Sequence, residues 1–298
     1  MLLHVPAWLA GLLVPIAMSA QAPKRLAVVD SLQTPEAVSY DAALDVYFVS
    51  NINGQLGAKD GNGFITRIRG NGKLDSLHFI QGGRGGVTLN GPMGSRIQGD
   101  TLWVLDIDVL RGFNAKTGAP VATIDLAPLH PLLLNDLAIG PDGDFYVTDT
   151  GIQVGADGKI AHTGPDRIYH VGRDRKPTIA LESAALATAD GIDWDPAHRQ
   201  LVLAPFGGMS VQTWQPGAAA PVDVAPGKGQ FDGIEIERNG LILITSWADS
   251  SVASLEGTRL VRRISGRAPP ADVTYDARRH QVGIVSMVAS RFELWTLP

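Results

Sequence analysis

The chain has 298 residues, a formal net charge of −5 and 18% charged residues, a composition ordinary for a globular protein. This charge offers no electrostatic basis for binding nucleic acid or an anionic membrane. The chain contains no cysteine, which excludes disulfides, thiolate-bound zinc and a thiol nucleophile. Its 34 glycines and 19 prolines favour many short strands joined by turns over long helices.

The first 22 residues have the features of a secretion signal. The segment "MLLHVPAWLAGLLVPIAMSAQA" is apolar through Ile16 and ends in Ala20-Gln21-Ala22, a small-x-small cleavage pattern. A membrane anchor is the alternative, but the apolar run is too short to span a bilayer comfortably. We therefore expect an exported protein, periplasmic or secreted, whose mature chain folds as a single domain over residues 23–298.

One sequence pattern then recurs six times along the chain. Each copy has a polar residue near its start, alternating apolar positions, a turn and an apolar run. The copies are "PEAVSYDAALDVYFVSN" from Pro35, "NGPMGSRIQGDTLWVLD" from Asn90, "NDLAIGPDGDFYVTDT" from Asn135, "ADGIDWDPAHRQLVLAP" from Ala189, "FDGIEIERNGLILITSW" from Phe231 and "ADVTYDARRHQVGIVSM" from Ala271. Alternation with period two and turns such as "PDGD" and "RNG" indicate a β-hairpin in each copy.

Each predicted hairpin is followed by a second, more amphipathic pair of strands, as in "GFITRIRGNGKLDSLHFI" and "VLRGFNAKTGAPVATIDL". Four strands in a unit of about 40–55 residues are typical of a β-propeller blade. We predict an all-β fold, a six-bladed β-propeller with four-stranded antiparallel blades. The last unit ends in "FELWTLP" as its third strand, and the N-terminal strand "KRLAVVDSL" is predicted to complete it and close the ring.

Six polar residues stand at the heads of the predicted inner strands. They are Glu36, Asn90, Asn135, Asp190, Asp232 and Asp272. Inner strands of a propeller line its central channel, so we expect these side chains to converge at one mouth. Several carboxylate and amide oxygens suit a hard cation such as Ca²⁺, and clustered acids repel unless a cation or protons compensate. Alternatively, each is a strand-entry residue that bonds nearby backbone amides.

The blade rhythm and four of these heads resemble the family of senescence marker protein, gluconolactonase and luciferin-regenerating enzyme. Members are similar in placing a divalent cation, usually Ca²⁺, in the channel of a six-bladed propeller. The resemblance implies four ligands here: Glu36 in "TPEAVSYD", Asn135 in "LLLNDLAIGPDG", Asp190 in "ADGIDWD" and Asp232 in "FDGIEIERNG". In lactonase members the fifth-blade Asp is also the proposed general base. The resemblance therefore gives Asp232 a catalytic role beside a cation that polarises the lactone carbonyl.

The substrate side of the mouth departs from the family pattern. Sugar-lactone members often carry an Arg that holds substrate hydroxyls where this chain has Leu133. Four residues are candidates for substrate binding from their positions at heads and second-strand ends. They are Asn90, Asp149, Phe206 and Trp247. The two aromatic side chains could instead pack between blades.

Two functions stay open from the sequence. We favour an exported hydrolase of a lactone or other cyclic ester, dependent on a divalent cation, with a small-molecule substrate. The alternative is a non-catalytic, NHL-like binding propeller in which a structural metal ties the blades together. No G-x-S-x-G elbow stands between a strand and a helix, which argues against a serine hydrolase. No nucleic-acid partner is expected, and no membrane contact after the signal is cleaved.

Overall fold

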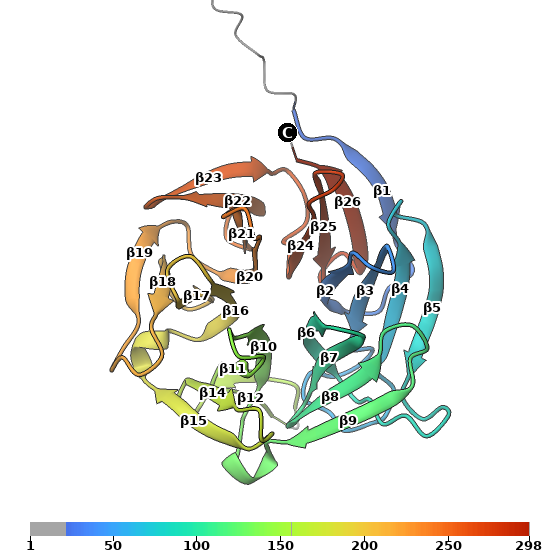
Figure 1. Cartoon of the computed structure of the whole chain (residues 1–298), viewed down its shortest axis with the longest axis horizontal. Helices are drawn as coiled ribbons and strands as arrows, with labels where there is room; N and C mark the ends of the chain where they lie inside the picture. Colours follow the sequence, from blue (N-terminus) through green and yellow to red (C-terminus); the bar gives the residue numbers. More distant parts are fainter. Residues whose placement is uncertain (1–21, 156, 298) are drawn as a thin grey trace, which may run out of the picture.

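The fold is a closed ring of small sheets around a central axis (Figure 1). The computed structural model describes residues 22–155 and 157–297, so the predicted signal lies outside the described residues except for Ala22. Six four-stranded antiparallel sheets account for almost all regular structure. The predicted six-bladed β-propeller is confirmed. Within the described ranges, no helix is long and apolar enough to cross a membrane.

Blades 1 to 5 follow the chain, each from its innermost to its outermost strand. Blade 1 contains β2 (Pro35–Asp41), β3 (Val46–Asn51), β4 (Phe64–Arg69) and β5 (Leu74–Gln81). Blade 2 contains β6 (Pro92–Gln98), β7 (Thr101–Asp106), β8 (Val109–Asn114) and β9 (Pro120–Asp125). Blade 3 contains β10 (Leu134–Ile139), β11 (Phe145–Asp149), β14 (Arg167–Val171) and β15 (Pro177–Glu182). Blade 4 contains β16 (Ala189–Asp195), β17 (Gln200–Pro205), β18 (Ser210–Trp214) and β19 (Val222–Pro226). Blade 5 contains β20 (Phe231–Ile236), β21 (Ile242–Ser246), β22 (Ser251–Glu256) and β23 (Arg259–Ile264).

Blade 6 joins the two ends of the chain. It contains β24 (Val273–Asp276), β25 (Gln281–Ser286), β26 (Arg291–Thr296) and the N-terminal β1 (Arg25–Val29) as its outer strand. The β1–β26 register pairs Val29 with Phe292, and the strands run antiparallel. The predicted closure of the ring by the N-terminal strand is therefore confirmed. It leaves β26 paired on both sides, which removes an exposed sheet edge.

Four short elements of the described residues lie outside the blades. The hairpin of β12 (Ile152–Val154) and β13 (Ile160–His162) is inserted between β11 and β14. Two 3-10 turns, η1 (Ala127–Leu129) and η2 (Ala184–Leu186), lie between consecutive blades. Since β11 ends beside the first residue of β10, the inserted hairpin stands at the end of the channel where the inner strands begin.

The acid that ends several inner strands explains part of the repeated sequence pattern. Asp41, Asp195 and Asp276 each accept a hydrogen bond from the backbone N–H two residues later, at 2.8–3.0 Å. This contact is the Asx-type turn that starts the hairpin between the first and second strands. The same acid recurs because three of the blades need the same turn.

The core lies between neighbouring blades and not in the channel. One cluster joins Ala138 and Tyr146 of blade 3 to Ile192, Leu201 and Trp214 of blade 4. Each sheet is thus apolar on both faces and packs on the next, as the near-continuous burial of the inner strands shows. Because both faces are used for packing, the channel is left for the polar ends of the inner strands.

Candidate metal centre

The predicted ligands share one position in the strand register. In blades 1, 3, 4 and 5 the first residue of the inner strand pairs with the last residue of the second strand, and a register irregularity follows at once. The residue at that irregularity is Glu36, Asn135, Asp190 or Asp232, one from each of these blades. A bulge bends the strand and re-aims a side chain, and here it lies beside the channel.

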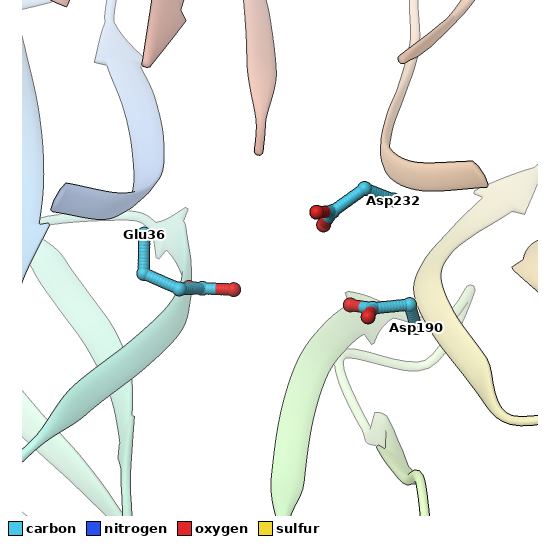
Figure 2. Close-up of side chains that lie close together, drawn as sticks. All are labelled: Glu36, Asp190 and Asp232. Carbon is cyan, nitrogen blue, oxygen red and sulfur yellow. The ribbon is translucent and has the colours of Figure 1, made fainter. Parts of the chain in front are cut away.

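Three carboxylates converge at this position. Glu36, Asp190 and Asp232 each offer an oxygen that lies within 4.8 Å of the others. Figure 2 shows the three side chains pointing toward one another from separate strands. All three are buried, with exposed fractions of 5%, 8% and 7%. Glu36 and Asp232 are 196 positions apart in the sequence, yet the structure brings them together with Asp190. Acids approach so closely only where a cation or protons compensate their charge.

Asn135 completes the arrangement. It lines the same small cavity as the three acids, and the cavity encloses about 10 Å³, close to the space that one water-sized sphere needs. The Oδ1 atom of Asn135 and the Oε2 atom of Glu36 are buried without a hydrogen-bond partner. Buried oxygens without donors are costly, so these two atoms fit the role of cation ligands.

The electrostatics of the cluster point the same way. Burial, with Asp190 as the largest charged neighbour, raises the pKa of Glu36 well above its usual value. Burial and Asp136 raise the pKa of Asp190. Burial, followed by Asp190 and Glu36, raises the pKa of Asp232. The raised pKa values favour the protonated acids when no cation is bound, and a bound cation would favour their ionised forms.

The donor set suits a hard divalent cation. Three carboxylates and one amide supply only oxygen, which is the preference of Ca²⁺ and Mg²⁺, and Ca²⁺ accepts the flexible geometry of ligands from four different strands. Among the described residues the group that could hold a metal ion is Glu36, Asp190 and Asp232, with no His in it, which makes zinc a poorer match.

Two glycines in the repeated phrases allow the acidic strands to approach. A Cβ on Gly191 would overlap the carbonyl oxygen of Asp232, and a Cβ on Gly233 would overlap the side chain of Asp272. The inner strands of blades 4, 5 and 6 therefore meet at a distance that only glycine permits. This is the physical reason that Asp is followed by Gly in "ADGID" and "FDGIE".

Two of the six predicted heads occupy other positions. We call the residue that follows the first pair of each blade, such as Glu36 in blade 1, its ring position. In blade 1 that first pair is Pro35 with Asn51, and in blade 2 it is Pro92 with Asp106. The ring position of blade 2 is therefore Met93, not Asn90. In blade 6 the pair of Val273 with Ile284 is equivalent to the pair of Val38 with Val49 in blade 1. The ring position lies two residues before the first member of this pair, so it is Ala271, and Asp272 follows it. The ring is therefore four oxygen-bearing residues plus Met93 and Ala271. Asp272 still lines the small cavity, while its Oδ2 accepts the Val38 N–H at 2.8 Å.

Asn90 and Asp149 make hydrogen bonds within the fold. The amide of Asn90 donates to Asp106 at 3.2 Å and accepts from the Gly61 N–H. The carboxylate of Asp149, 1% exposed, accepts the N–H of Leu133 and the hydroxyl of Tyr169. Both residues were predicted to bind substrate, and the structure shows them engaged in holding the loops at the mouth.

The same kind of hydrogen bond recurs in five blades. A polar side chain at or near the end of the second strand bonds to the loop that leads into the inner strand of the same blade. Asn51 accepts from Gln33 N–H, Asp106 from Asn90 N–H and Asp149 from Leu132 N–H, while Ser246 donates to Gly229 O and Ser286 to Pro269 O. These hydrogen bonds hold the loop that precedes the inner strand in five blades.

The two predicted aromatic residues stand together at the mouth. Phe206 and Trp247 each follow the last residue of a second strand, and their rings meet edge to face with centroids 5.7 Å apart. The indole of Trp247 lies close enough to Asp232 to lower the pKa of that acid against the larger effect of burial. The indole Nε1 is buried without a partner.

A second layer of charge lies behind the ring, and the sequence analysis did not identify it. Arg96 of β6 is buried in the channel, where it donates to Asp136 at 3.3 Å and to the carbonyl oxygens of Ile192 and Ile234 at 3.3 and 3.0 Å. Burial raises the pKa of the nearby acids Asp193 and Asp272 to about 6 and about 7, and Arg96 opposes that rise. A basic residue on an inner strand was the available sequence signal.

Comparison with known proteins supports the fold. No protein-family model and no curated protein matches the sequence. A gluconolactonase from Xanthomonas campestris superposes with a TM-score of 0.67 and 16% identity over 93% of this chain and 89% of that one. A luciferin-regenerating enzyme superposes with a TM-score of 0.62 and 12% identity over 90% of this chain and 94% of that one. Virginiamycin B lyase from Staphylococcus aureus superposes with a TM-score of 0.61 and 14% identity over 94% of this chain and 99% of that one.

All three are six-bladed propellers. The fold is therefore the one that the sequence resemblance implied, and two of these neighbours, the gluconolactonase and the luciferin-regenerating enzyme, bear names of that family. Identities of 12–16% establish similarity of fold alone, since one fold serves many functions. The function has to be argued from the site.

Proposed function

We propose that this protein is an exported hydrolase of a lactone or other cyclic ester that depends on a divalent cation, with Ca²⁺ as the first choice. The observation that carries the proposal is the convergence of Glu36, Asn135, Asp190 and Asp232 around one small cavity, with two buried oxygens lacking a partner. These four residues would hold the cation. The lactonase-like fold of the structural neighbours supports the proposal.

A cation bound there would polarise the substrate carbonyl and favour negative charge on its oxygen. Asp232 would act as the general base. Its carboxylate accepts a proton from a water molecule as the water oxygen bonds to the carbonyl carbon, and the ring C–O bond then breaks. The proton passes to the departing ring oxygen, so that lactone and water give a hydroxy acid. Asp232 suits this role because it lines the cavity and lies beside Trp247.

The test combines metal analysis with turnover. Purified mature protein should contain about one divalent cation per chain, and its hydrolysis of a lactone panel should stop with chelator and return with Ca²⁺. Asp232→Asn keeps the shape of the side chain but loses the base, so turnover should fall by at least about 100-fold. A metal-bound protein that hydrolyses no lactone or ester would leave the non-catalytic binding propeller as the function. N-terminal sequencing of exported protein checks the predicted start near Pro23.

A further inference from the structure

The mouth around the candidate metal centre has an apolar side wall. Ile52 and Met287 each follow the last residue of a second strand, so they lie at the same end of the channel as the four predicted ligands. Ile52 packs in one cluster with Met93 and Leu133, and Met287 contacts this cluster as well as the one between blades 1 and 6. Met93 occupies the ring position of blade 2 itself. On this side of the mouth the ligands are therefore flanked by hydrocarbon side chains.

This wall continues into a pocket formed by two segments far apart in sequence. The loop after β3 reaches the β12–β13 hairpin that is inserted between β11 and β14, where Gln55 Nε2 donates to the carbonyl oxygen of Gly155 at 3.4 Å. Between them lies a cavity of about 230 Å³ that is lined by Leu56, Leu132, Leu133, Ile152 and Val154, among others, and by no charged residue. Leu133 is shared by the pocket and the wall, and it stands two residues before Asn135.

The side chains that line this pocket are mainly aliphatic, and they favour an occupant that is itself apolar. A sugar lactone brings several hydroxyls, each of which loses hydrogen bonds to water on entering and meets few polar side chains that could replace them. An alkyl or aryl group gains free energy with each carbon buried, by a factor of roughly four in affinity per methylene. Two glutamines, Gln55 and Gln153, are the polar side chains among the pocket residues, and they stand at its exposed rim.

We propose that the substrate is a lactone with an apolar substituent, which occupies the pocket between the β3–β4 loop and the β12–β13 hairpin while its ring ester faces Asp232. This inference rests on the proposed hydrolase function and specifies its substrate class. Leu56, Ile152 and Leu133 are the specificity-determining residues. Phe206 and Trp247 form the opposite side of the mouth, where they cover the ester from water.

The test compares lactones of one ring size that differ in their substituent. A series of δ-lactones with alkyl chains of increasing length should show kcat/KM rising several-fold per methylene until the pocket is filled, and every member should exceed gluconolactone by at least tenfold. Ile152→Gln should raise KM for the alkyl lactones about tenfold with kcat nearly unchanged. Ile179→Gln is the matched control, since Ile179 is exposed on the outer strand β15.

Two results would overturn the inference: gluconolactone turned over as well as the alkyl series, or Ile152→Gln leaving KM for the alkyl lactones unaltered. A binding measurement separates this failure from failure of the proposed function. Calorimetry with wild-type protein, loaded with Ca²⁺, and a hydrolysis-resistant δ-lactam that carries the longest alkyl chain should show binding that Ile152→Gln weakens about tenfold. Binding without turnover by the wild-type protein contradicts the hydrolase but keeps the pocket, and absence of binding rejects the pocket.

Discussion

Arg96 donates to the carbonyl oxygen of Ile234 at 3.0 Å, so a side chain of blade 2 holds the inner strand of blade 5 two residues beyond Asp232. The same guanidinium reaches Ile192 O, two residues beyond Asp190. One buried cation thus positions the strands that carry two of the predicted ligands. It also compensates acids of the second layer, since its charge lowers the pKa of Asp193 and Asp272 against the effect of burial.

Replacing this cation should be costly to the fold. We expect Arg96→Met to lower the free energy of unfolding by about 3–5 kcal/mol, because it leaves buried acids and two carbonyl oxygens without their partner. Urea denaturation of the metal-free proteins measures the loss. Arg69→Met, whose side chain is 62% exposed, is the control and should cost less than about 1 kcal/mol. Equal losses of unfolding free energy in the two variants would show that Arg96 stabilises the fold no more than an exposed arginine does.

A divalent cation should stabilise the protein through the acidic ring. We expect Ca²⁺ at 100 times its dissociation constant to add about 2.7 kcal/mol, and chelator to remove it. Asp190→Asn should abolish this response. In the absence of metal the same variant should melt at a higher temperature than wild type at pH 7–8, because it removes one of three mutually repelling acids. A metal response that survives Asp190→Asn would place the ion elsewhere.

The buried acids make the stability of the metal-free protein depend on pH. Acids with a raised folded-state pKa bind protons more tightly in the folded chain, so their contribution to stability is present at low pH and is lost as pH rises. For Asp193 and Asp272 the window runs from the unfolded value near 4 to about 6 and about 7. We expect the metal-free protein to melt at a higher temperature at pH 5 than at pH 8.

Calcium should reduce this difference, and so should Asp272→Asn, which removes one of the titrating groups. Thermal melts from pH 4.5 to pH 8.5, with and without Ca²⁺, measure both effects. A metal-free melting temperature that climbs steadily with pH over this range would contradict the raised pKa values.

Ring closure should depend on the N-terminal strand. Deleting residues 23–29 from the mature chain removes Val29 from the core and exposes the edge of β26. We expect the truncated protein to lose several kcal/mol and to aggregate through the open edge. Size-exclusion chromatography and denaturation check this. The double variant Lys24→Ala and Leu26→Ala is the control, since both side chains are exposed and the strand itself remains.

Local chemistry explains how much of this protein the sequence determines. Period-two alternation, the Asp that starts each of several hairpins and the turn glycines are properties of neighbouring residues, and they were enough to predict six blades and the closing strand. The repeat also placed Glu36, Asn135, Asp190 and Asp232 among six candidate head residues, and the family resemblance then selected these four as ligands. In a repeated fold, residues at the same position of successive blades lie around the central axis, so a repeat in the sequence indicates which residues come together.

Tertiary structure decided whatever depends on contacts between blades. The register of blade 2 places Met93 in the ring because Asp106 binds the backbone of Asn90 and Gly91, a contact that no local pattern indicates. The role of Arg96 exists only where four blades meet, and the apolar pocket exists only where two distant segments touch. Periodicity indicates which face of a strand a side chain is on. The charged or apolar residues of other blades that this side chain contacts are determined only when the ring closes.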